Sequence, residues 1–264
     1  MIAETRAACP HFDQANDFAI INYHKLNKSK IYDYCVNAYT GCQVGCRYCY
    51  ARLFIPRYTG HTEPWGTFVD AKVNAPDILR RQLRRGKRGA VWVSSVCDAY
   101  QPLEAKMRLT RRCLEALLEV QWPVHVQTKS VLVLRDMDLF KQFREVEVTF
   151  TVATEDERTA RLFEPGASPV GERIAALGKL HENGIRTVAF IGPVLPGDPA
   201  KLVAALAGMV DHVLVDRMNY IDQLRAFYSR VGLAHASTEE FFRDMKNRYQ
   251  DELSRHNISF ELLF

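Results

Sequence analysis

The sequence lacks any long run of apolar residues, and none approaches the roughly 18 that a membrane-spanning helix requires. Its first residues, MIAETRAACPHFDQAND, are polar and acidic, whereas a secretory signal peptide needs a basic segment followed by an apolar one. We therefore expect a cytoplasmic protein that has no membrane partner.

The sequence also lacks the even, regularly spaced set of cysteines that a disulfide framework would need. It contains seven cysteines, an odd number, and in a reducing compartment these are free thiols or metal ligands. The eight histidines show no spacing typical of metal ligands. The cysteines are therefore the residues to inspect for a metal.

Composition gives no sign of disorder or of a second domain. Apolar residues make up 47% and charged residues 25% of the 264 positions, as in an ordinary globular protein. Because α/β barrels reach this length with a single core, we expect one domain over residues 1–264.

The net charge of +4 is small but unevenly distributed. The run Arg80–Arg88, RRQLRRGKR, holds six cations and no acid. Such a run can bind a polyanion such as nucleic acid, or it can be the solvated end of a helix, where cations complement the helix dipole. Interleaved aromatic residues would favour single-strand binding, and the run has none, so both interpretations stay open.

Apolar, β-branched segments alternate with helical patterns, which is typical of a parallel α/β fold. Such βα units form an open, doubly wound sheet or an incomplete barrel, and periodicity does not distinguish the two. We further expect an irregular loop over 54–75, amphipathic helices over 220–231 and 237–255, and an apolar end that closes or caps the sheet. The expected strands are Ile31–Asn37, Ala90–Ser95, Val124–Thr128, Val146–Val152, Thr187–Ile191 and His212–Asp216; the helices between them are 76–85, Thr110–Val120, Val131–Phe143, Pro169–Asn183 and Pro199–Met209.

Three cysteines crowd the segment NAYTGCQVGCRYCY (37–50): Cys42, Cys46 and Cys49, with the spacing C-x3-C-x2-C. They are expected to follow the first strand directly, at the end where parallel α/β folds bind ligands. A closed zinc site needs four ligands, and no second cysteine pair lies at a suitable distance. A thioredoxin-like pair would not explain Cys42. Three thiolates around an iron–sulfur cube leave one iron open for a substrate or cofactor.

The triad, with Tyr48 before its last cysteine, resembles the signature of the radical S-adenosylmethionine (SAM) enzymes. The longer string NAYTGCQVGCRYCYAR is similar to the spore photoproduct lyase-like branch, although this chain has Ala38 where proline is usual and Val44 where histidine is common. The resemblance continues in the same order over roughly residues 30–200, in the blocks CDAYQPLE (97–104), TKSVLVLRD (128–136), TFTVATEDERTARLFEP (149–165) and GPVLPGD (192–198).

This resemblance implies an α/β fold: a partial (β/α)6 TIM-type barrel over about residues 30–217 with C-terminal helices over 218–264. It implies a [4Fe–4S] cluster on the three cysteines, with SAM on the open iron. Reductive cleavage of SAM would give a 5′-deoxyadenosyl radical that abstracts hydrogen from a substrate, and the electron would come from an external donor of the flavodoxin or ferredoxin type. The substrate stays open, with nucleic acid among the candidates. The alternative function is a non-catalytic iron–sulfur or zinc module that binds nucleic acid.

The resemblance also gives roles to residues that follow the expected strands. Cys97 is a candidate catalytic residue, although in spore photoproduct lyase the hydrogen-donating cysteine lies about two residues earlier, at the position of Ser95. Tyr50, next to the triad, is a second catalytic candidate that would face the cavity. The expected cofactor contacts are Tyr48 and Gly192 at the adenine of SAM, Lys129 at its carboxylate, Thr151 near the ribose or methionine, and Asp98.

Overall fold

An open, mostly parallel sheet of eight strands forms the centre of the computed structural model, which describes residues 18–21, 27–29 and 31–264. Its order is β11-β10-β9-β8-β7-β6-β3-β2, and only β2 runs antiparallel to its neighbour. Within the described residues, β2 and β11 do not pair, so the barrel is incomplete. The strands are β2 (Asn27–Lys28), β3 (Tyr34–Val36), β6 (Val91–Val93), β7 (Val124–Thr128), β8 (Val146–Thr151), β9 (Arg186–Ile191), β10 (His212–Val215) and β11 (Phe260–Leu262).

The six strands expected from the sequence are confirmed as β3 and β6 to β10. Alternate residues of each strand face opposite sides of the sheet. Val91 and Val93 of β6 belong to the core under the outer helices, whereas Trp92 between them lies on the other, inner face. The strand register continues this inner row through His125 and Glu147. The inner face therefore carries polar and aromatic side chains.

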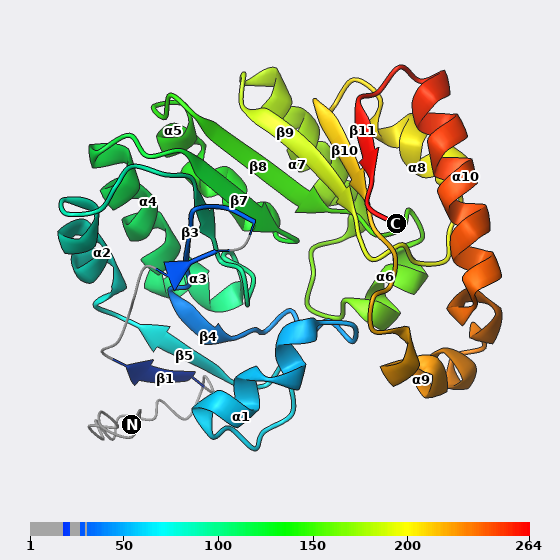
Figure 1. Cartoon of the computed structure of the whole chain (residues 1–264), viewed down its shortest axis with the longest axis horizontal. Helices are drawn as coiled ribbons and strands as arrows, with labels where there is room; N and C mark the ends of the chain where they lie inside the picture. Colours follow the sequence, from blue (N-terminus) through cyan, green and yellow to red (C-terminus); the bar gives the residue numbers. More distant parts are fainter. Residues whose placement is uncertain (1–17, 22–26, 30) are drawn as a thin grey trace.

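Helices cover the outer face of the sheet (Figure 1). They match the expected segments, except that 131–143 begins as a 3-10 helix and becomes α-helical only for its last turn. Short polar side chains start several of them; the Asp198 carboxylate, for example, accepts a hydrogen bond from the Ala200 N–H. The covering elements are α2 (Ala75–Leu83), α4 (Leu109–Glu119), η2 (Val131–Asp136), α5 (Met137–Phe140), α7 (Val170–Glu182) and α8 (Pro199–Leu206).

A second, three-stranded sheet with the order β1-β5-β4 lies beside the first. It contains β1 (Phe18–Ile21), β5 (Val69–Lys72) and β4 (Tyr39–Gly41). Two expectations are therefore wrong. The region 54–75 is not one irregular loop, because it contains α1 (Ile55–Thr59) and β5, and the cysteine triad follows β4 rather than the first strand of the large sheet. Strands this short are too brief to show periodicity, and long-range pairing holds them.

The C-terminal residues extend the sheet and cover one side of it. Residues 220–231 form η3 (Ile221–Gln223) and α9 (Arg225–Arg230), while the second expected helix is η4 (Ala234–Ser237) followed by α10 (Glu239–Arg255). The final apolar segment forms β11, which pairs in parallel with β10. No helix in the described part of the chain is long and apolar enough to cross a membrane.

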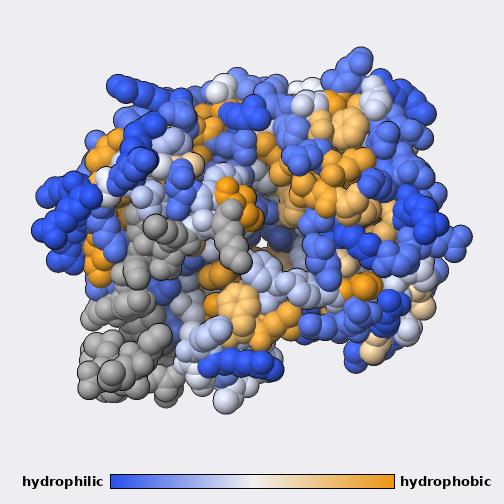
Figure 2. Space-filling view, viewed as in Figure 1, coloured by the Kyte–Doolittle hydropathy of each residue, from blue (hydrophilic) through white to orange (hydrophobic). Residues whose placement is uncertain are grey.

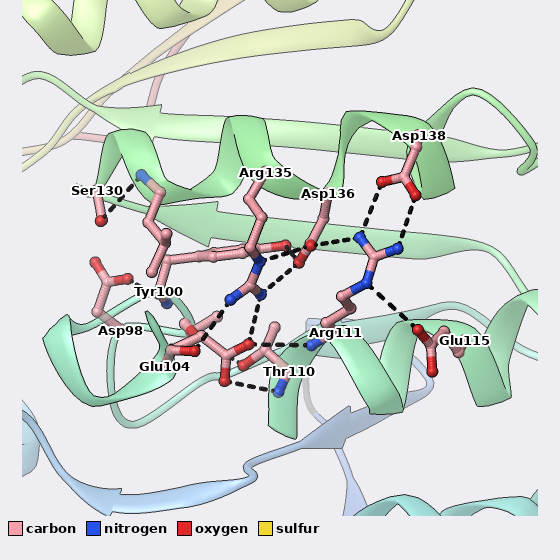
Figure 3. Close-up of polar contacts among 12 residues, drawn as sticks. Asp98, Tyr100, Glu104, Thr110, Arg111, Glu115, Ser130, Arg135, Asp136 and Asp138 are labelled. Carbon is pink, nitrogen blue, oxygen red and sulfur yellow. Dashed lines mark hydrogen bonds and ion pairs between the residues drawn. The ribbon is translucent and has the colours of Figure 1, made fainter. Parts of the chain in front are cut away.

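A buried ionic network lies between α3 (Pro102–Met107), α4 and η2 (Figure 3). Its fully buried carboxylates, Glu104 and Asp136, share the Arg135 guanidinium, whose Nη2 lies 2.6 Å from Glu104 Oε1 and 2.8 Å from Asp136 Oδ2. Asp136 also pairs with Arg111 at 2.8 Å. Glu104 accepts the hydroxyl of Tyr39. Because Tyr39 begins β4, the network ties the small sheet, and hence the start of the cysteine loop, to the outer helices.

We expect Glu104→Ala to lower the free energy of unfolding by about 3–5 kcal/mol, because it leaves donors of the buried network without their acceptor. Chemical denaturation measures this change. The matched control is Glu119→Ala, which removes an exposed partner of Arg80 and should cost at most about 1 kcal/mol. Equal losses for the two variants would contradict the assigned role of the network.

Candidate active site

The cysteine loop, residues 42–49, connects β4 to the 3-10 helix η1 (Tyr50–Leu53). It makes tight turns: Gly41 and Gly45 have φ of 84° and 63°, in the left-handed region that glycine tolerates. The Cys49 N–H donates to the carbonyl of Cys46 at 3.2 Å. The glycines of the motif thus allow the chain to fold back between its cysteines.

Backbone contacts fix this loop against the segment that follows α6 (Glu157–Phe163). The Arg47 N–H donates to the Phe163 carbonyl at 2.8 Å, and the Gly166 N–H donates to the Val44 carbonyl at 3.0 Å. A Cβ atom at Gly166 would lie 2.5 Å from the Gln43 carbonyl oxygen, so only glycine allows this approach. The loop is therefore held near the carboxyl end of β8, which precedes α6.

The three thiols of the triad fit the donor set of an iron–sulfur cluster. All three are free of disulfide bonds, and Cys42 and Cys46 are only 5% and 7% exposed. The Asp98 N–H donates to Cys42 Sγ at 3.3 Å, a bond that stabilises a thiolate. Burial raises the pKa of Cys46 to about 12, so metal binding would have to displace the proton. No three His, Cys, Asp or Glu side chains of the described residues converge on a single-metal site, so the zinc alternative lacks a ligand set here.

Asp98 connects the triad to the third strand of the barrel. Its carboxylate accepts hydrogen bonds from Thr128 Oγ1 at 2.6 Å and from the Lys129 N–H at 2.8 Å. A third bond, from the Tyr100 N–H at 2.8 Å, closes a turn after Asp98 itself. The carboxylate therefore positions the end of β7, and a contact between Asp98 and the cofactor stays a prediction.

Lys129 and Tyr48 lie together beside the triad, with Lys129 Nζ 5.6 Å from the centre of the Tyr48 ring. The Tyr48 hydroxyl donates to Glu164, which forms a buried ion pair with Arg173 at 2.7 Å. Burial acts to lower the pKa of Lys129, but the nearby charges of Cys46 and Glu164 raise it above its ordinary value. Lys129 is therefore a cation, and Tyr48 is a ring held at one end.

Thr151 and Gly192, the other expected cofactor contacts, lie at the carboxyl ends of β8 and β9. The Thr151 carbonyl accepts a bond from Arg173 Nη1 at 2.8 Å, and its hydroxyl accepts a long one from Gln127 at 3.4 Å. A side chain at Gly192 would overlap the ring of Phe190. The packing of Phe190 thus explains the glycine without a cofactor, and the adenine contact stays a prediction.

The two expected catalytic residues occupy different surroundings. Cys97 packs beside the triad; its Sγ lies 3.2 Å from Ser94 Oγ and 3.6 Å from the Tyr39 carbonyl, and burial raises its pKa to about 11. Tyr50 is 39% exposed, and its hydroxyl donates to the Ser95 carbonyl. Cys97 is placed to act near the triad, whereas Tyr50 lies at an outer rim; their catalytic roles stay predictions.

The basic run Arg80–Arg88 covers the last turn of α2 and the residues after it, as a helix end would. Ion pairs occupy its two ends: Arg80 contacts Glu119 at 2.8 Å and Arg88 contacts Glu145 at 2.6 Å. A polyanion partner stays a prediction. The cations of the run that are exposed and without an ion pair to a described residue are Arg81, Arg84, Arg85 and Lys87.

A cavity of about 550 Å³ lies at the opposite end of the strands from the triad. It is lined near the sheet by His125, Glu147 and Arg186, which form a chain of polar contacts of 2.8 Å each. These residues stand at the amino ends of β7, β8 and β9, and none of the triad lines the cavity. The cavity is therefore separate from the cysteine site.

Sequence reasoning assigned no role in the site to two residues that shape it, Glu164 and Arg173. Both are almost fully buried, and they hold the Tyr48 hydroxyl and the Thr151 carbonyl. Their only signal was their place in the blocks shared with the resembling family, since charged residues near a strand end usually lie at the surface. The amide of Gln101 is a further such residue: its Oε1 accepts the Gln43 N–H at 2.9 Å and so anchors the cysteine loop.

Solved structures share this architecture. Spore photoproduct lyase, as a mutant with bound AdoMet and dinucleoside spore photoproduct, has a TM-score of 0.70 at 14% identity, over 94% of this chain and 82% of that chain. SuiB of Streptococcus suis bound to S-adenosylmethionine has a TM-score of 0.56 at 12% identity, over 94% of this chain and 51% of that chain. At these identities the likeness shows the fold, which confirms the radical SAM architecture expected from the sequence.

Sequence comparisons identify the family. An uncharacterised protein of Methanocaldococcus jannaschii is 40% identical over 176 residues, 67% of this chain and 64% of that protein. A radical SAM Nalpha-GlyT isomerase of Pseudomonas phage M6 is 26% identical over 157 residues, 59% of this chain and 32% of that protein. The matches thus span less than two thirds of these relatives. The family model of the radical SAM superfamily matches residues 36–209, which include the triad, so this chain belongs to the radical SAM superfamily.

Proposed function

We propose that this chain is a radical enzyme that holds a [4Fe–4S] cluster on Cys42, Cys46 and Cys49 and binds SAM beside it. When bound, this pair supplies reductive cleavage of SAM to methionine and a 5′-deoxyadenosyl radical, which abstracts hydrogen from a substrate. Membership of the radical SAM superfamily supports SAM-dependent chemistry. The surroundings of the triad support the ligand set.

The contacts of Asp98 are the observation that carries the proposal. Its backbone N–H donates to Cys42 Sγ at 3.3 Å, and its carboxylate accepts the Lys129 N–H at 2.8 Å. A cluster ligand and a buried cation are thus held together by a single residue. This arrangement suits a cofactor that binds a metal through one end and presents a carboxylate to a cation, as SAM does.

Lys129 and Tyr48 supply the shape of the cofactor pocket. The Lys129 ammonium can donate to the SAM carboxylate, and charge-assisted bonds of this kind are stronger than neutral ones. The Tyr48 hydroxyl is occupied by Glu164, so the ring is fixed in orientation and can cover the adenine. The buried Glu164–Arg173 pair beneath it keeps the ring from turning.

The substrate is proposed to bind on the inner face of the sheet. Figure 2 shows the molecule hollowed near its centre. The Thr149 hydroxyl on this inner face is buried and has no hydrogen-bond partner among the described residues, and the neighbouring position on β7 is the polar Gln127. Buried polar groups normally find a partner, so a polar group of the substrate, or a water that it displaces, would complete this pair.

The first test replaces the triad. Cys42→Ala, Cys46→Ala and Cys49→Ala, each purified and reconstituted without oxygen, should lose most of the iron and sulfide and the absorption near ~400 nm of an iron–sulfur cluster. They should also lose cleavage of SAM by dithionite. Cys113→Ala is the matched control, because Cys113 is buried in the hydrophobic core of α4 and should keep its iron. Full iron content in the triad variants would show that the ligands are wrong.

The second test concerns Lys129. We expect Lys129→Met to keep its cluster but to bind SAM about 10- to 100-fold more weakly, because one charge-assisted hydrogen bond contributes roughly 1.5–3 kcal/mol. Equilibrium binding of radiolabelled SAM measures the change. Lys141→Met removes an equal charge at the far end of the strands, where Lys141 is exposed. Unchanged affinity in the Lys129 variant would exclude this lysine as the carboxylate contact.

A further inference from the structure

The helices η1 and α1 form a cationic surface directly after the cysteine loop. The segment 47–62, RYCYARLFIPRYTGHT, contains three arginines and no acid. Arg47 and Arg57 are exposed and Arg52 is half-buried, and none of the three forms an ion pair with a described residue. This uncompensated charge lies next to the proposed cluster ligands, unlike that of the basic run on α2.

A row of aromatic rings runs along the same surface. Tyr50, Phe54 and Tyr58 follow one another at intervals of four residues, with ring centres 5.8 Å and 6.2 Å apart. The outermost ring, Tyr58, is 84% exposed. Tyrosine and arginine are the side chains most often found at the energetic centres of protein interfaces, so an exposed tyrosine flanked by arginines is typical of a docking surface.

This surface packs over the outward side of the triad. Cys49 is less buried than Cys42 and Cys46, and it lies against the small apolar cluster of Ala51, Ile55 and Phe68. Phe54 contacts the same cluster from the outside. A protein bound to η1 and α1 would therefore be separated from Cys49 by a thin layer of side chains.

We propose that the surface formed by Tyr50, Arg52, Phe54, Arg57 and Tyr58 docks a small acidic electron-transfer protein, either a flavoprotein or an iron–sulfur protein. The inference rests on the proposed function, because reductive cleavage of SAM consumes one electron that none of these side chains supplies. In this step the donor is oxidised by one electron and the cluster site is reduced by one, with no leaving group. Complementary charge would steer the acidic donor to the arginines.

The geometry of the rings favours a protein over a single-stranded nucleic acid. Bases bind best on a free ring face or between separated rings. Here the Tyr50 and Phe54 rings are tilted by 35° and contact each other, while the Phe54 and Tyr58 rings meet edge to face at 68°. The row therefore has no slot for a base, and it presents one continuous apolar ridge between cations.

The experiment compares the reconstituted enzyme with its Arg57→Glu/Tyr58→Ala variant, using an acidic flavodoxin as the donor. We expect the Kd of the enzyme for flavodoxin, measured by calorimetry, to rise at least about tenfold, as for loss of an interface centre. The rate of SAM cleavage driven by reduced flavodoxin should fall by a similar factor. Cleavage driven by dithionite, a small reductant that needs no docking site, should stay within about twofold.

Two further variants control for charge and folding. Arg85→Glu reverses one exposed charge on the basic run near α2 and should leave flavodoxin affinity nearly unchanged. Arg57→Gln alone, at an exposed position, should weaken binding to a smaller extent and at low salt only.

Several outcomes would overturn the docking surface. These are no flavodoxin binding by the wild-type enzyme, equal binding by the double variant, or an equal fall in the dithionite-driven rate. Loss of affinity for a single-stranded oligonucleotide, with flavodoxin binding intact, would assign the surface to nucleic acid instead. Absence of SAM cleavage with dithionite in the wild type would refute the proposed function, which the calorimetry does not test.

Discussion

The hydrogen bonds of Asp98 are the interaction on which the site depends. One residue, just past β6, binds Cys42 through its backbone and the end of β7 through its carboxylate. The cysteine loop and Lys129 come from segments far apart in the sequence, and Asp98 fixes their separation. A site that must hold a metal cluster and a charged cofactor in register needs such a rigid connection, since small displacements cost catalytic rate steeply.

Two buried ionic networks support this connection from opposite sides. Glu104, Arg135 and Asp136 anchor the strand before the cysteine loop through Tyr39. Glu164 and Arg173 anchor the ring of Tyr48 after it. Buried ion pairs contribute little net stability, because desolvation offsets their attraction. Their position around the loop indicates that they serve geometry: each lets a side chain be held in one orientation deep in the protein.

Local patterns in the sequence predicted the six central strands, most outer helices and the triad, because strand periodicity and a compact motif can be recognised without tertiary contacts. The short strands β4 and β5 could not be predicted this way, since pairing between Tyr39–Gly41 and Val69–Lys72 stabilises them. The roles of Asp98 and Glu164 were hidden for the same reason. Their partners lie tens of residues away, and only the fold brings them together.

The central claim is that the triad leaves one metal position for SAM, and Mössbauer spectroscopy of protein reconstituted with labelled iron tests it most directly. The account predicts that adding SAM shifts the signal of one iron and leaves the others unchanged, because three irons are held by Cys42, Cys46 and Cys49. A spectrum in which SAM changes no iron would contradict it, as would a protein that binds a single zinc in place of the cluster.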